Sequence, residues 1–591
     1  MNRRDALIAG LLAIILAILL LPFARQGIDP HHDGIMLKPA LDVLAGQVLF
    51  RDTFTQYGAL TTYLQAAALW FQPTLLSLRL QTVAAYAVTL FFLYAAWRMI
   101  LPRSLAIVSC GLFILFIPAY EKNWLDQYWM LLPWSSVYAM MFQSVALYAL
   151  FRVIRSEQPV AWGAILGAAG AGVFWCRQPV GMITTGCVAV IWLALWWTNW
   201  APASQSKRSI LLGILAGFAV VNAVLLGGIL ISGALPEWWY QNFVWPRHWA
   251  MESVNVSWKA FTTVFVHPAA GAWLMVLGLA AGFPAMVKRF HASLSARSVA
   301  LYYLCVASVL VWQHAWVGQV LALREGGWTV LFPLVVLVQS LISLARAFAP
   351  RGAPRSTEYY LVAALAVFAL GSLLQYYPVP DSWHILWSVA PAFGLLAFVF
   401  WRWVGWPVPV VAVVLSMALL PSLYAKTQTI RRALTRPLVT LAQPAVLRGM
   451  KVPPEQARSL SSITATLDPI LKHQPDIPSA LIGNDALFLC FTQNHANPTP
   501  YYVTWVGLAN NPEHEKLWNY FVLRARPVMF LHKAQWDAVG DFYRRARYIP
   551  LLYLPEEALE IAIPQELADA MGLKAYGAAP GGEATKQTSK P

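Results

Sequence analysis

Two carboxylates and two imidazoles lie immediately behind the first long apolar segment, in the sequence Asp29-Pro-His31-His32-Asp33. A carboxylate held at a surface can act as a general base that takes a proton from an attacking hydroxyl. The neighbouring imidazoles could bind a metal or a ligand, or they could tune the carboxylate. Asp33 could instead cap a helix that starts near Gly34, and Asp29, followed by Pro, favours a turn. The spacing therefore leaves two roles open for Asp33, general base or helix cap.

A single arginine, Arg177, lies between two long apolar segments, with Gln178 beside it. An ionised side chain in a membrane costs about 2.5–3.5 kcal/mol on insertion scales, so its presence needs a reason. A guanidinium binds phosphate through parallel donors, and a fixed cation would stabilise the charge on a phosphate leaving group. Arg177 could instead extend to the membrane surface without binding a ligand. Phosphate recognition and surface anchoring are therefore the two hypotheses for this residue.

Other polar side chains could join these groups from later segments. Glu121 and Asp126 are candidates for a further acidic residue, and Asp126 is preferred because it lies nearer the next apolar run. The alternative for both is a solvated charge among aromatic anchors. The remaining candidates are His248, Arg324, Asp381 and His384. The last two fall on one face if a helix begins early, although the aspartate would equally serve as a helix cap.

The composition indicates a membrane protein. Of the 591 residues, 59% are hydrophobic and only 12% are charged, whereas a soluble chain carries about 25% charged residues. This shortage of charge excludes a soluble enzyme, a disordered scaffold and a nucleic-acid binder. The net charge of +15 is expected from the positive-inside bias of membrane proteins and needs no nucleic-acid partner. The five cysteines show no CxxC spacing and so predict neither a zinc site nor a disulfide framework.

Apolar segments long enough to cross about 30 Å of hydrocarbon recur up to residue 424. The run from Ala6 to Ala24 has no clean cleavage site, so we interpret it as a spanning helix and not as a signal peptide. Thirteen transmembrane helices are expected in total. The other twelve are predicted at 78–98, 104–118, 134–152, 160–175, 180–200, 209–232, 266–287, 298–322, 328–346, 358–377, 384–402 and 407–424.

The basic loops predict which side of the membrane each loop occupies. All the loops rich in Arg and Lys share one side with Arg3 and Arg4 if the segment 58–75 does not cross, and the positive-inside rule makes that side cytoplasmic. Segment 58–75 contains Thr61, Thr62 and Gln65 and then Pro73, which is typical of a helix lying at the interface. The N-terminus is then cytoplasmic, and residues 25–77 form one long first external loop. An odd number of crossings also places everything after residue 424 outside.

The composition of the chain changes after residue 424. Charged residues become frequent again, and prolines interrupt the region 425–578. Short apolar runs predict strands at 479–482, 528–531 and 549–553, and longer stretches predict helices at 455–473, 513–524 and 535–546. Residues 579–591 are rich in Gly, Thr and Lys and are expected to be disordered. The expected fold is an all-α polytopic membrane domain, residues 1–424, with a small C-terminal extracytoplasmic α/β domain.

The first external loop resembles that of the GT-C superfamily. These are polytopic glycosyltransferases that use polyprenyl-phosphate sugars, and they include protein O-mannosyltransferases and lipid A aminoarabinose transferases. The resemblance rests on Asp33 just past the first transmembrane helix, an Ala/Leu helix ending in Gly46, the pair Arg51-Asp52, and Tyr57 in a Gln-Tyr-Gly sequence. It extends more weakly to Arg177-Gln178 and to the segment 378–384. The long first external loop and the count of thirteen helices also fit that superfamily.

By this resemblance, Asp33 matches the first residue of the family's acidic pair, whereas Gly34 stands where the second would be. Asp29 or one of the histidines could take that place, so metal use stays open: no cofactor is certain, and a divalent cation is the alternative. The resemblance implies Asp33 and Asp126 as catalytic residues. Together with the candidates above, the predicted substrate-binding residues are Asp29, His31, His32, Lys38, Arg51, Asp52, Tyr57, Glu121, Arg177, Gln178, His248, Arg324, Asp381 and His384.

The predicted function is a glycosyltransferase with its active site on the outer face of a bacterial inner membrane. It would move a hexose or pentose from a polyprenyl-phosphate donor to a glycan, lipid or protein acceptor, with inversion. Asp33 would be the base, assisted by Asp126, and Arg177 would hold the donor phosphate.

Two alternatives belong to other classes of protein. A transporter or flippase of a lipid-linked or polar solute is disfavoured because no two-fold repeat is visible and the polar residues crowd one face. A non-catalytic assembly protein whose tail binds a partner is disfavoured by the polar cluster at residues 29–33. The enzymatic prediction requires Asp33 and Arg177 to open into one chamber.

Overall fold

The computed structural model describes residues 2–117, 131–198, 200, 206–246, 336–341, 343–344, 357–373, 375, 382–403, 405–497, 500, 502, 512–532 and 545–576. The chain divides into two compact units. Unit 1 comprises residues 1–26, 56–64 and 79–436, and unit 2 comprises residues 27–55, 65–78 and 437–591. The predicted first external loop is thus divided between the units. Five of the predicted site residues lie outside the described residues: Glu121, Asp126, His248, Arg324 and Asp381. The predicted membrane spans 266–287 and 298–322 also lie outside them.

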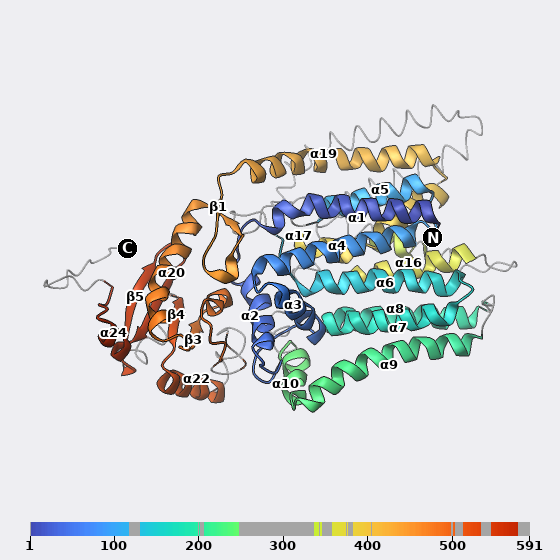
Figure 1. Cartoon of the computed structure of the whole chain (residues 1–591). Helices are drawn as coiled ribbons and strands as arrows, with labels where there is room; N and C mark the ends of the chain where they lie inside the picture. Colours follow the sequence, from blue (N-terminus) through green and yellow to red (C-terminus); the bar gives the residue numbers. More distant parts are fainter. Residues whose placement is uncertain are drawn as a thin grey trace, which may run out of the picture. The chain divides into compact units, whose positions relative to one another are not determined.

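Long apolar helices make up most of the described part of unit 1, and they run side by side (Figure 1). Six described helices are long and apolar enough to cross a membrane. They are α1 (Arg3–Ala24), α4 (Leu75–Trp97, whose first turn belongs to unit 2), α6 (Ser135–Arg155), α7 (Pro159–Cys176), α8 (Gln178–Trp197) and α9 (Lys207–Ile231). Large apolar side chains on their outer surfaces are exposed, such as Leu7 on α1 and Val224 on α9. Apolar residues facing outward over such lengths are those of a multi-pass membrane protein.

The remaining helices of unit 1 are shorter or interrupted. They are α3 (Ala59–Phe71, which continues into unit 2), α5 (Arg103–Leu115), α10 (Leu235–Trp239), η2 (Tyr240–Val244), α16 (Thr357–Leu373), α17 (Ser382–Val389), α18 (Ala392–Phe398), η5 (Val399–Trp403) and α19 (Val408–Thr435). At 13 residues, α3 is only about 20 Å long and too short to cross a bilayer. The predicted span 384–402 is divided among α17, α18 and η5, and α19 runs eleven residues past the predicted boundary at 424. The count of thirteen helices stays a prediction.

Polar contacts fix which loops share an end of the helix bundle. Asp5, near the start of α1, forms ion pairs with Arg98 (3.2 Å) and Arg103 (2.9 Å) in the α4–α5 link. Arg155, at the end of α6, donates a hydrogen bond to the carbonyl of Met99 at 3.0 Å. These basic loops therefore lie together at one end of the bundle. Arg177 follows α7, whose 18 residues run away from that end, so it lies at the other.

A mixed four-stranded sheet forms the centre of unit 2, with strand order β3-β4-β6-β5. The elements of the unit are α2 (His32–Leu44), β1 (Val439–Thr440), η6 (Ala445–Leu447), β2 (Lys451–Val452), α20 (Pro454–His473), β3 (Ser479–Ile482), η7 (Ala486–Phe491), α22 (Pro512–Ala525), β4 (Val528–His532), β5 (Tyr548–Leu554), β6 (Leu559–Pro564) and α24 (Gln565–Met571). β3 is parallel to β4, while β4–β6 and β6–β5 are antiparallel. The strands expected from the sequence are β3, β4 and β5, and β6 is an addition.

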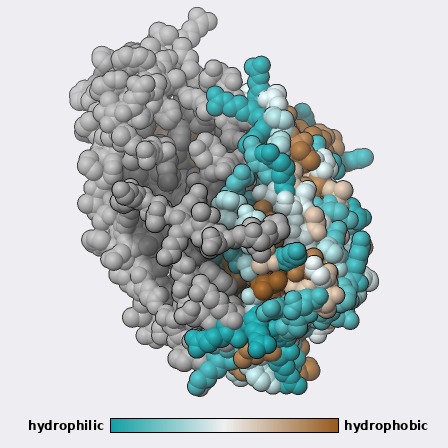
Figure 2. Space-filling view, turned by 90° about the vertical axis from the view of Figure 1, so that its left-hand side faces the viewer, coloured by the Kyte–Doolittle hydropathy of each residue, from teal (hydrophilic) through white to brown (hydrophobic). Residues whose placement is uncertain are grey.

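The two faces of this sheet carry different partners, because successive side chains of a strand point to opposite faces. Met529 and Leu531 of β4 share a buried cluster with Trp518 of α22. Phe530, between them, stacks on Phe488 of η7 at 5.8 Å. The outer surface that carries these elements is largely hydrophilic where it is described (Figure 2). Unit 2 thus has an apolar core and a water-compatible surface, and η7 is held against the sheet.

Candidate functional site

Asp29 and Asp33 accept backbone hydrogen bonds at the N-terminus of α2, which begins at His32. Asp29 Oδ1 accepts hydrogen bonds from the backbone N–H groups of His31 (3.0 Å) and His32 (2.9 Å), which satisfies the first turn as a helix cap does. Asp33 Oδ2 accepts a hydrogen bond from the Asp29 N–H at 2.9 Å, and the Asp33 side chain is fully buried. Both carboxylates therefore have a structural contact here, and the role of Asp33 as a base stays a proposal.

The two imidazoles beside this cap have partners within unit 2. His32 Nδ1 lies 2.9 Å from Asp29 Oδ2, and His31 Nδ1 lies 2.7 Å from the carbonyl oxygen of Asn484. Burial raises the pKa of Asp29, but the hydrogen bond and charge of His32 outweigh burial and hold that pKa below its ordinary value. Burial, with the nearby His32, lowers the pKa of His31. Asp29 is thus an ionised acceptor bound by its own helix and by His32.

A divalent cation does not fit these donors. Both carboxylate oxygens of Asp29 are engaged, by two backbone N–H groups and by His32. Across the part of the chain that the structure describes, no three His, Cys, Asp or Glu side chains form a group that could hold a metal ion. We therefore derive no step through a metal at this position.

Asp485 is a titratable residue beside this cluster that was not among the predicted site residues. Burial, reinforced by the charge of Asp29, raises the pKa of Asp485 to about 6, while the nearby His532 and His32 oppose that rise. A carboxyl group with a pKa near neutrality can both take and give a proton. No local sequence signal could have identified it, because the charges that shift its pKa belong to Asp29 and His32 at the start of α2 and to His532 of β4.

Gly34 allows α2 to pack directly on the backbone of η7. A Cβ at position 34 would lie 2.1 Å from the backbone nitrogen of Leu487 and 2.7 Å from the carbonyl carbon of Ala486. The Leu487 N–H donates a hydrogen bond to the carbonyl of Pro30 at 3.1 Å, so the two segments are bonded as well as packed. The acidic residue that the GT-C resemblance would place at this position is therefore sterically incompatible with η7.

Gly34→Ala should separate η7 from α2, because the clash involves backbone atoms that cannot rotate away. We expect a loss of about 1–3 kcal/mol of stability in unit 2 and exposure of the buried Cys490 of η7. Thiol labelling mapped by mass spectrometry would detect the exposure. Gly10→Ala is the matched control, since a Cβ there meets nothing within 4 Å. Equal protection of Cys490 in both variants would contradict the packing argument.

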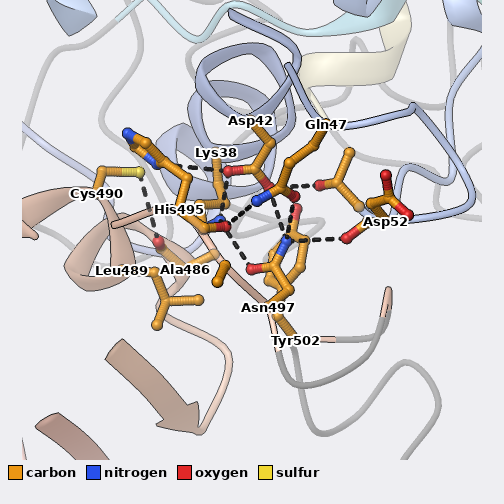
Figure 3. Close-up of polar contacts among 12 residues, drawn as sticks. Lys38, Asp42, Gln47, Asp52, Ala486, Leu489, Cys490, His495, Asn497 and Tyr502 are labelled. Atoms are coloured by element: carbon orange, nitrogen blue, oxygen red, sulfur yellow. Dashed lines mark hydrogen bonds and ion pairs between the residues drawn. The ribbon is translucent and has the colours of Figure 1, made fainter. Parts of the chain in front are cut away.

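Lys38 and Asp42 form a buried ion pair at the centre of a polar network in unit 2 (Figure 3). Lys38 Nζ lies 2.5 Å from Asp42 Oδ1 and donates a hydrogen bond to Asn497 Oδ1 at 2.8 Å. Asp42 Oδ2 accepts hydrogen bonds from Thr53 (2.7 Å) and Asn497 (2.9 Å). Burial raises the pKa of Asp42, but Lys38 and the hydrogen-bond donors around it hold that pKa below its ordinary value. Lys38 is thus engaged within unit 2, and its role in substrate binding stays a prediction.

Lys38→Met should destabilise unit 2 by about 3–5 kcal/mol, because it leaves the charge of Asp42 buried without its counter-ion. Limited proteolysis and thermal unfolding of the purified protein would measure this loss. The double variant Lys38→Met/Asp42→Leu should recover most of it, since both charges are then removed. A Lys38→Met variant that unfolds like the wild type but binds donor more weakly would support the predicted role of Lys38 in substrate binding.

Arg51 and Asp52 form an exposed pair in the turn after α2. Arg51 Nε lies 2.9 Å from Asp52 Oδ1, and Asp52 Oδ2 accepts a hydrogen bond from the Val48 N–H at 2.8 Å. The hydrogen bond from Arg51 lowers the pKa of Asp52. Exposed ion pairs of this kind contribute little stability. Both residues thus contact each other in a turn on the surface of unit 2, and their predicted role in substrate binding stays a prediction.

Arg177 lies in the break between α7 and α8 in unit 1. Its backbone is extended, and Pro179, which has no N–H, follows at the start of α8. The guanidinium donates a hydrogen bond to Ser136 Oγ at the start of α6, and it lies 5.9 Å from the centre of the Trp387 ring. The imidazole of His384 meets the same ring at 5.1 Å. The structure thus brings the predicted residues Arg177 and His384 to one place.

Tyr57 approaches Arg177 from the segment before α3. Burial raises the pKa of the Tyr57 hydroxyl, and the charge of Arg177 opposes that rise. A Cβ at Gly58 would lie 2.0 Å from the carbonyl oxygen of Trp175, and the Gly58 N–H bonds to the carbonyl of Cys176 at 3.1 Å. Glycine at position 58 therefore permits the close approach that places Tyr57 beside the α7–α8 break.

Gln178 contacts the helical turns that follow α9. Its side-chain amide donates a hydrogen bond to Asn242 Oδ1, and Asn242 in turn donates to the carbonyl of Trp238 at 3.0 Å. Trp175 stacks on Trp238 at 5.5 Å. Sequence reasoning missed Ser136, Trp387 and Asn242. Of these three residues, only Trp387 could have been predicted, because it follows His384 by three residues and would share its helix face.

The charge of Arg177 is not neutralised by a neighbouring acid. Among the described residues, no Asp or Glu forms an ion pair with Arg177. Its partners there are a hydroxyl and an aromatic ring. A partly buried cation in this setting lowers its energy by binding an anion.

Comparison with known proteins gives structural matches only. No protein-family model matches the chain, and no curated protein matches it significantly. Among solved structures, it is similar to the Archaeoglobus fulgidus oligosaccharyltransferase tethered with an acceptor peptide that contains the NVT sequon. That match has a TM-score of 0.48 and 12% identity, and it covers 95% of this chain and 74% of the other. The chain is also similar to the archaeal oligosaccharyltransferase AglB from the same organism in complex with an inhibitory peptide and a dolichol-phosphate (TM-score 0.45, 13% identity, coverage 95% and 74%).

A third match is ArnT from Cupriavidus metallidurans bound to undecaprenyl phosphate, with a TM-score of 0.39 and 12% identity. It covers 95% of this chain and 98% of the other. At this identity and TM-score, the likeness does not by itself assign an activity or a substrate to the chain.

Proposed function

We propose that the chain is a membrane glycosyltransferase that moves a monosaccharide from a polyprenyl-phosphate donor to an extracytoplasmic acceptor. The observation that carries the proposal is the positive charge of Arg177. It lies at the end of the helix bundle away from the basic loops and, among the described residues, has no acidic counter-ion. A cation fixed beside a bilayer can bind the phosphate of a lipid while the polyprenyl tail stays in the hydrocarbon.

The proposed reaction is a direct displacement at the anomeric carbon. The acceptor hydroxyl attacks that carbon, the bond from the carbon to the phosphate oxygen breaks, and the configuration inverts. Asp33 takes the proton of the hydroxyl, as a positioned carboxylate can. The leaving polyprenyl phosphate gains negative charge, which Arg177 stabilises. Tyr57, Gln178 and His384, which line the same region of unit 1 as Arg177, would orient the donor.

We place the protein in a bacterial inner membrane, with the N-terminus in the cytoplasm and unit 2 outside. The support is the clustering of the basic loops near Asp5 at one end of the bundle, which the positive-inside rule makes cytoplasmic. Arg177 then faces the external side. The acceptor would be a glycan, a lipid or a protein on that side.

The direct test uses the purified full-length protein in lipid nanodiscs with an undecaprenyl-phosphate sugar. Transfer of the sugar to an added acceptor, or its slow hydrolysis to water, with release of undecaprenyl phosphate, supports the proposal. Proteoliposomes loaded with the same donor test the transporter alternative. Movement of the intact donor across the bilayer without release of the sugar would overturn the proposal.

A further inference from the structure

The first turn of α6 lies beside Arg177 and has no side-chain cap. The helix is 21 residues long and begins at Ser135, and the residue before it is Trp134, which offers no side-chain acceptor. Within the described part of the chain, the backbone N–H groups of Ser135 and Ser136 have no acceptor. The N-terminus of a long helix combines such free donors with the positive end of the helix dipole.

Ser135 adds an independent sign that a ligand belongs there. Its side chain is fully buried, and its hydroxyl has no hydrogen-bond partner among the described residues. Cβ atoms of a helix tilt toward its N-terminus, so the hydroxyl of this first residue is directed to the same side as the free N–H groups. A buried hydroxyl left without a partner is unfavourable, and a ligand that accepts its hydrogen bond removes that cost.

Arg177 contacts the first turn of α6 directly, because its guanidinium donates a hydrogen bond to Ser136 Oγ. The groups collected here are a guanidinium, two backbone N–H groups and a hydroxyl. All of them can donate hydrogen bonds, and none carries negative charge. Such a set matches a tetrahedral oxyanion, and helix N-termini bind phosphate in this way.

We infer that the first turn of α6 and Arg177 form one seat for a phosphate group. This inference rests on the proposed function, in which the phosphate belongs to a polyprenyl-phosphate donor. Arg177 binds two of the phosphate oxygens, while Ser135 and the free N–H groups of the turn bind the others. When the bond to the sugar breaks, the charge that develops on the phosphate meets donors that are already oriented.

Ser135→Asp in the full-length protein tests the seat. A carboxylate in the first turn satisfies the free N–H groups and repels a phosphate, while it favours the helix through the dipole. We expect undecaprenyl phosphate, measured by native mass spectrometry in nanodiscs, to bind at least about tenfold more weakly, with an unchanged or higher unfolding temperature. Ser135→Ala, which removes only the hydroxyl, should weaken binding about threefold and serves if the Asp variant does not fold.

The matched control is Ser209→Asp in the first turn of α9. That residue is exposed, and its helix is capped by Ser206, whose hydroxyl accepts a hydrogen bond from the Ser209 N–H at 3.1 Å. The same change of side chain there should leave the binding of undecaprenyl phosphate as in the wild type. Undecaprenol, which lacks the phosphate, should bind equally to the wild type and to both Asp variants.

The outcomes separate the seat from the proposed function. Wild-type binding of undecaprenyl phosphate by Ser135→Asp and Ser135→Ala, together with loss of binding by Arg177→Gln, overturns the seat and leaves the glycosyltransferase proposal standing. Binding of inorganic phosphate that depends on Ser135, in a protein that neither binds undecaprenyl phosphate nor transfers sugar from it, supports the seat and overturns the proposed function.

Discussion

Arg177→Gln should lower the rate of sugar transfer by at least about 100-fold and the affinity for the undecaprenyl-phosphate sugar donor by at least about tenfold. Gln is polar and can still donate hydrogen bonds, but it has no charge to bind a phosphate. The rate falls further than the affinity because the phosphate carries more charge as it leaves than in the bound donor. Measurements of kcat and KM in nanodiscs would separate the two effects.

Arg152→Gln is the matched control for this variant. Arg152 also lies over aromatic rings, 4.6 Å from the centre of Trp162 and 5.9 Å from that of Tyr148, but it belongs to the opposite end of α6. Its loss should affect stability and leave transfer unchanged. Arg177→Lys should fall between the wild type and Arg177→Gln, since it keeps the charge and loses the forked geometry. Wild-type transfer by Arg177→Gln would remove Arg177 from the phosphate site.

Asp33→Asn should lower the transfer rate by about 10²–10⁴-fold while the protein stays folded. The Asn oxygen can still accept the hydrogen bond from the Asp29 N–H, which the Asp33 carboxylate accepts at 2.9 Å in the native protein. The amide cannot take a proton from an acceptor hydroxyl. The variant therefore separates the two roles that the sequence left open for this residue. Turnover numbers and unfolding temperatures, measured on one preparation, are the required readouts.

Two companion variants complete the test of Asp33. Asp33→Ala removes the hydrogen bond as well and should cost about 1 kcal/mol of stability in addition to activity. Asp476→Asn makes the same chemical change in an exposed loop of unit 2 and should transfer sugar as the wild type does. If Asp33→Asn turns over normally and only Asp33→Ala is impaired, Asp33 is a helix cap and the base is a different residue.

Asp485 and Gly34 show why parts of the site could not be predicted. The pKa of Asp485 depends on burial and on the charges of Asp29, His32 and His532. The first two residues lie more than 450 positions before Asp485 in the chain, and His532 belongs to β4. The reason for glycine at position 34 lies in the backbone of η7, more than 450 residues away. Lys38 likewise has the pattern of a free cation beside a membrane, yet its partner Asn497 comes from the far end of the chain.

The amino-acid sequence by itself determined the properties that depend on neighbours along the chain. The apolar runs specify α1, α4 and α6–α9, because a helix that satisfies its own backbone is the way for such a run to cross a bilayer. The short apolar runs after residue 424 specify β3, β4 and β5. The position of Arg177 between two apolar runs was equally visible, and with it the need for a partner for its charge.

Only the tertiary structure decided which groups surround each charge. Lys38 and Asp42 neutralise each other inside unit 2, whereas Arg177 meets a hydroxyl and an aromatic ring beside the uncapped turn of α6. The energy of a buried charge is set by the groups within a few ångströms of it, and folding draws those groups from distant parts of the chain.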